Sequence, residues 1–222
     1  MVACTLSAAL VLTYRASGFD GAKELLRRCF DHTRIKNRLW YLPILLLMPV
    51  IFIVEFKWMK LTGAAFADLQ IPVLLAPVLF IAYFISATAE EIGWSGYAID
   101  PLQERWGALG ASLIVGVVWA VWHMIPYLQA HNPAEWVVWQ CAFTVANRVL
   151  IVWLYNNTGK SILAAILFHA MYDVCWSLYP NYGSNYDPAI TFVLTATVAL
   201  GVIFLWGPAT LTRYRFSRMP GQ

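Results

Sequence analysis

The chain has 222 residues, of which 60% are hydrophobic and only 12% are charged, and its formal net charge is +3. The charged share is about half of that in a soluble globular domain, which excludes a soluble monomer. The four cysteines form no CxxC pair, which excludes a disulfide framework and a cysteine-based zinc site.

The first predicted element, residues 2–14, is a short apolar segment that is either a partial membrane span or a frayed one. No small-residue cleavage pattern follows it, so we do not interpret it as a signal peptide. A basic stretch, residues 15–38, comes next, and within it residues 19–30 place apolar side chains near Lys and Arg. This pattern is typical of a helix that lies on the membrane surface, and we expect it to contact anionic lipid rather than nucleic acid.

Six further segments are apolar over lengths that suit a membrane span, which needs roughly 20 residues. Backbone groups in lipid must form hydrogen bonds within their own segment, so each span should be a helix. The sequence therefore predicts an all-α, polytopic membrane bundle of six to seven transmembrane helices with a polar intramembrane cavity. We expect residues 1–222 to form a single integral membrane domain. The six segments are residues 39–56, 71–97, 109–127, 135–155, 161–178 and 189–206.

The distribution of Lys and Arg predicts the orientation of the bundle. Twelve of the fifteen basic residues fall on one side of the predicted bilayer, which should be the cytoplasmic side. Short loops and the lack of a eukaryotic targeting signal favour the plasma membrane of a prokaryote. The twelve are the seven basic residues of 15–38, Arg105, Lys160, Arg213, Arg215 and Arg218.

Several ionisable side chains fall inside the predicted spans, where they are costly and usually face a cavity. His169 and Asp173 are four residues apart and share one helix face. Glu90 and Glu91 are about 100° apart and cannot point the same way. Glu55 lies at a span end, where we expect an interfacial position. The residues inside spans are Glu90, Glu91, His123, Arg148, His169 and Asp173.

Three of these side chains would suffice to hydrolyse an amide. A carboxylate in low dielectric, such as Glu90, can accept a proton from water near neutral pH. His123 could share that proton or pass it to the leaving amine, and His169 could stabilise the oxyanion as an N–H donor. The alternative is that these residues are buried polar groups that tie the helices together.

Three short motifs in this region resemble those of the CPBP intramembrane proteases, a family that includes type II CAAX prenyl proteases and proteins of bacteriocin processing and immunity. The family pattern is EExxxR, then FxxxH, then HxxxN or HxxxD on successive predicted spans. Here residues 90–95 read EEIGWS, residues 119–123 read WAVWH and residues 169–173 read HAMYD. The match covers about residues 87–173, which we take as the catalytic core.

The resemblance implies a function and a set of roles. Glu90 and His123 would activate the water, while His169 and Asp173 would form the oxyanion site. The implied reaction is hydrolysis of a peptide bond in a membrane protein or lipidated peptide within the bilayer. No cofactor is implied.

Two positions depart from the family pattern. Ser95 stands where the family has Arg, so Glu91 lacks the ion-pair partner that lies four residues along the same helix. Arg148, on another span, is a candidate replacement. Trp119 stands in place of Phe, which we interpret as a conservative change at a packing position.

Three alternatives stay open. Residues 93–96 read GWSG, the setting of the serine in rhomboid proteases, with Ser95 and His169 as the dyad. This interpretation leaves the two glutamates unexplained. Glu90, His123, His169 and Asp173 could instead bind zinc with an open position, although no HExxH motif supports a metal site. The missing Arg could also mark a catalytically degenerate scaffold or a bacteriocin-immunity protein.

Overall fold

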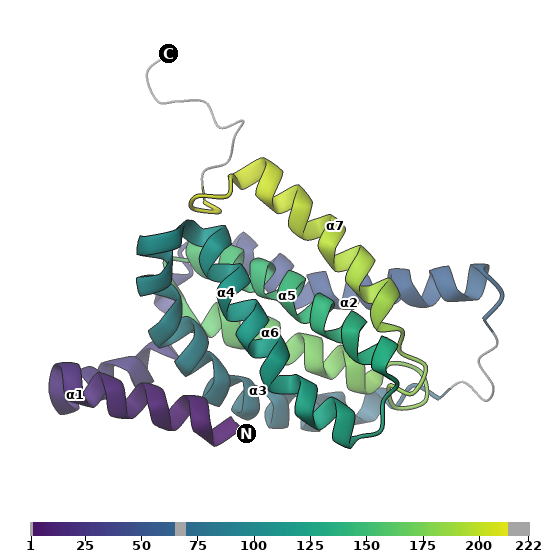
Figure 1. Ribbon diagram of the computed structural model, residues 1–222, viewed down its shortest axis with the longest axis horizontal. Coiled ribbons are helices and arrows are strands. Elements are labelled where there is room, and N and C mark those ends of the chain that lie inside the picture. Colours follow the sequence, from purple (N-terminus) through teal and green to yellow (C-terminus); the bar gives the residue numbers. More distant parts are fainter. Residues whose placement is uncertain (1, 65–69, 213–222) are drawn as a thin grey trace, which may run out of the picture.

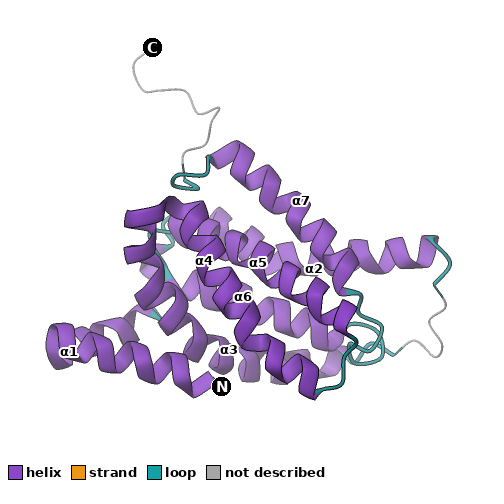
Figure 2. Cartoon of the chain, in the orientation of Figure 1, coloured by secondary structure: helices purple, strands orange, loops and turns teal. Residues whose placement is uncertain are grey.

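The structure is a computed structural model that describes residues 2–64 and 70–212, and over these ranges it contains helices and no strand (Figure 2). The prediction of an all-α bundle is confirmed. Arg213, Arg215 and Arg218 of the basic tail lie outside the described residues. The main helices are α1 (Val2–Arg28), α2 (Tyr41–Leu61), α3 (Ala76–Gly93), α4 (Ile99–Gln129), α5 (Ala134–Asn157), α6 (Ile162–Leu178) and α7 (Pro188–Trp206).

Short helical turns complete the described structure. Three are turns of 3-10 helix, and the fourth is a π-helical turn that joins α3 to α4. They are His32–Arg34, Arg38–Trp40, Val73–Leu75 and the π-helical turn Trp94–Ala98.

Four continuous helical stretches are long and apolar enough to cross a membrane. One of them, Val73–Gln129, includes nearly all of two predicted spans, residues 71–97 and 109–127, because the residues between these spans are mostly helical. A further apolar helix, α6, is shorter. The chain is therefore an integral membrane protein. Helix α1 is not among the four stretches, so a span at residues 2–14 stays a prediction. The four are Arg38–Leu61, Val73–Gln129, Ala134–Asn157 and Pro188–Trp206.

The predicted spans 71–97 and 109–127 leave Arg105 in a loop between them, and this prediction is wrong, because α4 begins at Ile99 and continues past Arg105. The chain changes direction at Gly107, which has φ 69° and ψ 173°. A Cβ atom at Gly107 would lie 3.2 Å from the carbonyl oxygen of Ala209, so this turn has both the backbone angle and the space that suit glycine. The N–H of Ala108 donates to the same oxygen at 2.8 Å, which ties the residues after α7 to the membrane part of α4.

Helix α1 bends at Gly18, and Figure 1 shows it doubling back near its middle. Its first half lies against α3, where the Thr5 hydroxyl donates to the carbonyl oxygen of Ala89 at 3.1 Å. A Cβ atom at Gly93 would lie only 2.9 Å from Thr5 Cβ, so the two helices approach closely at this glycine. In the second half Phe19 is exposed. The position of this half on the membrane surface stays a prediction.

Helix α5 is the best-buried candidate span: 72% of its most apolar stretch is buried, against 22% in α7. Helices α4, α6 and α7 all pack against it, and α3 packs against α6 (Figure 1). A polar side chain on the inner face of α5 is therefore separated from lipid by protein. This interior, between α3, α4, α5 and α6, holds the ionisable residues.

Glu55 on α2 does not occupy the interfacial position expected for it. Its side chain is fully buried. The carboxylate accepts hydrogen bonds from the Thr191 hydroxyl and from the backbone N–H of Asp187 at 3.1 Å. Because both donors belong to the start of α7, Glu55 ties α2 to α7.

Candidate active site

The Glu91 carboxylate, near the C-terminal end of α3, accepts three side-chain donors. Arg148 Nη1 on α5 lies 2.9 Å from Oε2, and His169 Nδ1 on α6 lies 3.0 Å from Oε1. The Ser95 hydroxyl also donates to Oε2. The side chain of Glu91 is 0% exposed, so its charge is balanced by protein groups instead of water. The contact that the sequence predicts between Glu91 and Arg148 is therefore present, and α3, α5 and α6 meet at this carboxylate.

Ser95 reaches Glu91 because it lies four residues later, in the π-helical turn Trp94–Ala98. Turns of this kind occur frequently at functional sites. The serine hydroxyl is engaged by Glu91, and His169 also directs Nδ1 to Glu91. The Ser95–His169 dyad of the serine-protease alternative is thus not formed in this arrangement.

Glu90 points to a different partner from its neighbour. The indole N–H of Trp119 donates to Glu90 Oε2 at 2.9 Å, and both residues are buried. Within the described residues this is the hydrogen bond that Glu90 receives. Its other oxygen, Oε1, is therefore available to a water molecule or a substrate.

The ring of His123 is held in a defined orientation. Nδ1 lies 3.0 Å from the carbonyl oxygen of Trp119, and because a carbonyl only accepts, Nδ1 must be the donor. In the neutral imidazole this leaves Nε2 with a free lone pair. Trp122 packs edge-on against the ring with centroids 5.1 Å apart, and Tyr127 stacks on it at 5.9 Å. Glu90 and His123 thus meet through one residue, Trp119.

His169 and Asp173 share one face of α6, as their spacing predicts. His169 Nε2 lies 3.6 Å from Asp173 Oδ2, which is too long for a hydrogen bond but close enough for an electrostatic interaction. Because Nδ1 already meets Glu91, Nε2 is the nitrogen that could face a substrate. The ring of His169 packs against Trp119 with centroids 4.9 Å apart. The four predicted catalytic residues, Glu90, His123, His169 and Asp173, therefore lie in one region.

Sequence reasoning missed two polar members of this region. The sequence predicts a packing role for Trp119, yet its indole N–H donates to Glu90 Oε2. Gln140 on α5 is fully buried, donates to the Tyr172 hydroxyl at 2.7 Å and accepts from the Tyr186 hydroxyl at 2.8 Å. The sequence signal for Gln140 is a polar side chain inside an apolar span, although this side chain is not ionisable.

The zinc alternative needs three or more ligands directed at one point. Across residues 2–64 and 70–212, no group of three or more His, Cys, Asp or Glu side chains is placed to hold a metal ion. His169 Nδ1 is occupied by Glu91. Whether the activity depends on a metal stays a prediction.

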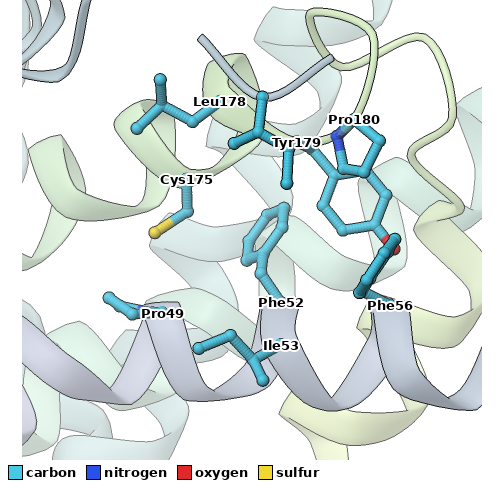
Figure 3. A pocket seen from close by; sticks show the side chains of 9 residues that line it. Pro49, Phe52, Ile53, Phe56, Cys175, Leu178, Tyr179 and Pro180 are labelled. Carbon is cyan, nitrogen blue, oxygen red and sulfur yellow. The ribbon is translucent and has the colours of Figure 1, made fainter. Parts of the chain in front are cut away.

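An apolar pocket of about 210 Å³ lies between α2 and the end of α6 (Figure 3). It is on another side of α6 from the polar residues, because Cys175 in its wall follows Asp173 by two residues, about 200° around the helix. The pocket therefore is not part of the polar site. It is lined by Pro49, Phe52, Ile53, Phe56, Ile71, Cys175, Leu178, Tyr179 and Pro180.

Two comparisons show which known proteins this chain is similar to. Residues 72–175, which contain all three motifs, match the family model described as type II CAAX prenyl endopeptidase Rce1-like. The CAAX prenyl protease 2 of Methanococcus maripaludis is 26% identical over 179 residues. That alignment covers 74% of this chain and 65% of the relative, so the chain spans just under two thirds of the relative's length. The two matches confirm the resemblance to the CPBP family that the motifs indicate.

Proposed function

We propose that the protein is an intramembrane endopeptidase that hydrolyses a peptide bond with water activated by Glu90 and His123. One observation carries the proposal: both residues are held by Trp119, Glu90 by the indole N–H and His123 by the main-chain carbonyl. This arrangement leaves Glu90 Oε1 and His123 Nε2 as the groups that are free to handle protons. General acid–base catalysis of this kind needs a base within hydrogen-bond reach of the water.

In the proposed reaction, the water loses one proton to Glu90 while its oxygen bonds to the carbonyl carbon. The oxyanion that forms faces His169, which in its doubly protonated form presents Nε2–H to it. When the C–N bond breaks, the proton taken by Glu90 passes through His123 to the leaving amine. Glu90 and His123 return to their starting states, and the net change is the addition of one water to the peptide bond.

The site supports a substrate that enters from the membrane, since its residues come from the inner faces of apolar helices. We propose a membrane protein or a lipidated peptide as the substrate, in the plasma membrane of a prokaryote with the basic loops in the cytoplasm. The printed name of the relative from Methanococcus maripaludis, a prenyl protease, supports the lipidated peptide.

The scaffold alternative is based on the loss of the family Arg at Ser95. In this chain Arg148 supplies a guanidinium to the same carboxylate from α5, at 2.9 Å. This contact supports a site that retains its chemistry.

The test compares new protein termini in host membranes that express either the wild type or Glu90→Gln at equal abundance. Glu135→Gln, at an exposed glutamate, is the matched control. Termini that appear with the wild type and with Glu135→Gln, but not with Glu90→Gln, would support the protease. If the wild type produced no termini of its own under any growth condition, the scaffold alternative would replace it.

A further inference from the structure

We infer that Trp119 is a positioning residue of this site, whose indole N–H fixes one oxygen of Glu90 and leaves the other directed at the water. The inference depends on the proposed function only for its kinetic consequence. The hydrogen bond itself is a property of the ground-state structure. Trp119 is 3% exposed and Glu90 is 5% exposed, so water does not compete freely for either group.

The geometry favours a role beyond packing. The N–H donates to Oε2 at 2.9 Å, a normal length for a hydrogen bond to a carboxylate. A carboxylate held through one oxygen cannot turn freely, so the second oxygen has a fixed direction. Placing the base in a fixed direction is one way in which enzymes lower the cost of reaching the reactive geometry.

Trp119 also contacts the other groups of the site. Its main-chain carbonyl orients His123, and its ring packs against His169. The guanidinium carbon of Arg148 lies 4.2 Å from the ring centroid, which is a cation–π contact. One residue therefore touches the proposed base, the proposed proton relay, the oxyanion group and the buried cation.

The contact between Trp119 and Arg148 bears on both departures from the family pattern. The family motif has Phe at this position, and a phenyl ring has no N–H to donate. The family also has its Arg at position 95, whereas here the cation is Arg148 on α5. Indole is a better cation–π partner than phenyl, so Trp119 suits a site in which the cation arrives from α5.

The first test measures the hydrogen bond and needs no substrate. Infrared difference spectra of the purified protein, wild type minus Glu90→Gln at one fixed pH, would isolate the carboxyl bands of Glu90. In Trp119→Phe these bands should move away from their wild-type frequency, because one oxygen of the carboxyl group loses the indole hydrogen bond.

The second test is kinetic and uses a peptide that spans a cleavage site found by the comparison of termini. Trp119→Phe should lower kcat by about 10- to 100-fold with KM nearly unchanged, since the lost contact orients the base and does not bind substrate. The matched control is Trp153→Phe. Trp153 is buried on α5, and its indole nitrogen has no hydrogen-bond partner in the described part of the chain.

A second variant separates the hydrogen bond from the shape of the side chain. Benzothienylalanine at position 119 has the outline of Trp with sulfur in place of the N–H, so packing is kept. It should reproduce the Trp119→Phe shift, while Trp153→Phe should behave as the wild type. Unchanged Glu90 carboxyl bands in both position-119 variants would overturn the inference. Shifted bands in a protein whose wild type cleaves nothing would uphold it and count against the protease.

Discussion

Arg148 on α5 donates a hydrogen bond of 2.9 Å to Glu91 on α3, which lies 57 positions earlier in the chain. The Ser95 hydroxyl reaches the same oxygen of Glu91. In the family pattern an Arg stands at position 95, so two positions on different helices converge on one carboxylate. The cation that meets Glu91 here comes from another helix, whereas the spacing of the family motif suits an ion pair within one helix.

Removal of the buried cation should destabilise the fold strongly. Arg148→Leu would remove the guanidinium from the fully buried Glu91 and leave it the His169 and Ser95 donors, and breaking a buried ion pair typically costs about 3–5 kcal/mol. Denaturant unfolding of the purified protein in detergent would measure this cost. Arg105→Leu, at an exposed residue of α4, is the control and should change stability little. Equal stability of the two variants would contradict the structural importance of the pair.

A double variant tests whether an arginine at position 95 can replace Arg148 as the partner of Glu91. Ser95→Arg alone adds a long side chain to a buried position and should destabilise the protein. In combination with Arg148→Ser, the new guanidinium should reach Glu91 through the space that Arg148 vacates. We expect the double variant to be more stable than the sum of the two single effects predicts, by about 0.5–3 kcal/mol as for other contacting pairs. Additive losses would show that the two positions are not interchangeable.

Ser95→Ala distinguishes a supporting serine from a nucleophile. The hydroxyl donates to Glu91, so its loss should lower the free energy of unfolding by about 1 kcal/mol while activity stays within tenfold of the wild type. Cleavage of the same peptide as above is the measurement, together with labelling by a serine-directed phosphonate. Abolished cleavage in a stable Ser95→Ala protein, with phosphonate labelling of the wild type at Ser95, would favour the serine-protease alternative.

Much of the fold and part of the site follow from the sequence because the bilayer restricts the choices. Each long apolar segment in lipid must be a helix, so the spans could be placed without knowledge of packing. An ionisable side chain inside a span is energetically costly, so Glu91 and Arg148 stand out in the sequence. Their pairing was predictable because neither charge has another evident partner.

The sequence does not predict how deeply a side chain is buried or which neighbour it faces, because hydropathy encodes neither. Residues 99–107 are polar enough to suggest a loop, yet they form the first turns of α4. Glu55 lies at a span end in sequence but deep in protein, because α7 covers it. The sequence predicts packing for Trp119, whose polar atom is a single N–H, and the folded chain shows that this atom donates to Glu90.

Glu55 should contribute to stability and not to chemistry. Glu55→Ala would leave the Asp187 N–H without its acceptor and the Thr191 hydroxyl with the Asp187 carbonyl oxygen alone, which should cost about 1–3 kcal/mol. Glu55→Gln keeps one acceptor oxygen and should cost less. Thermal unfolding in detergent measures both, with the exposed Glu104→Ala as the control. The infrared bands of the Glu90 carboxyl group should not move in either variant. A shift comparable to that of Trp119→Phe would mean that Glu55 acts on the site.

Removal of metal ions should leave the proposed activity intact. The proposed reaction uses Glu90 and His123 as proton carriers, and His169 directs one ring nitrogen to Glu91, so these side chains already have roles that compete with metal binding. Cleavage of the peptide by enzyme dialysed exhaustively against a strong chelator should match that of untreated enzyme. The control adds zinc back after dialysis and should neither raise nor restore the rate. If activity disappeared on dialysis and returned in proportion to added zinc, Glu90, His123, His169 and Asp173 would have to be reassigned as ligands, and the Glu90 carboxyl band should then change when zinc binds.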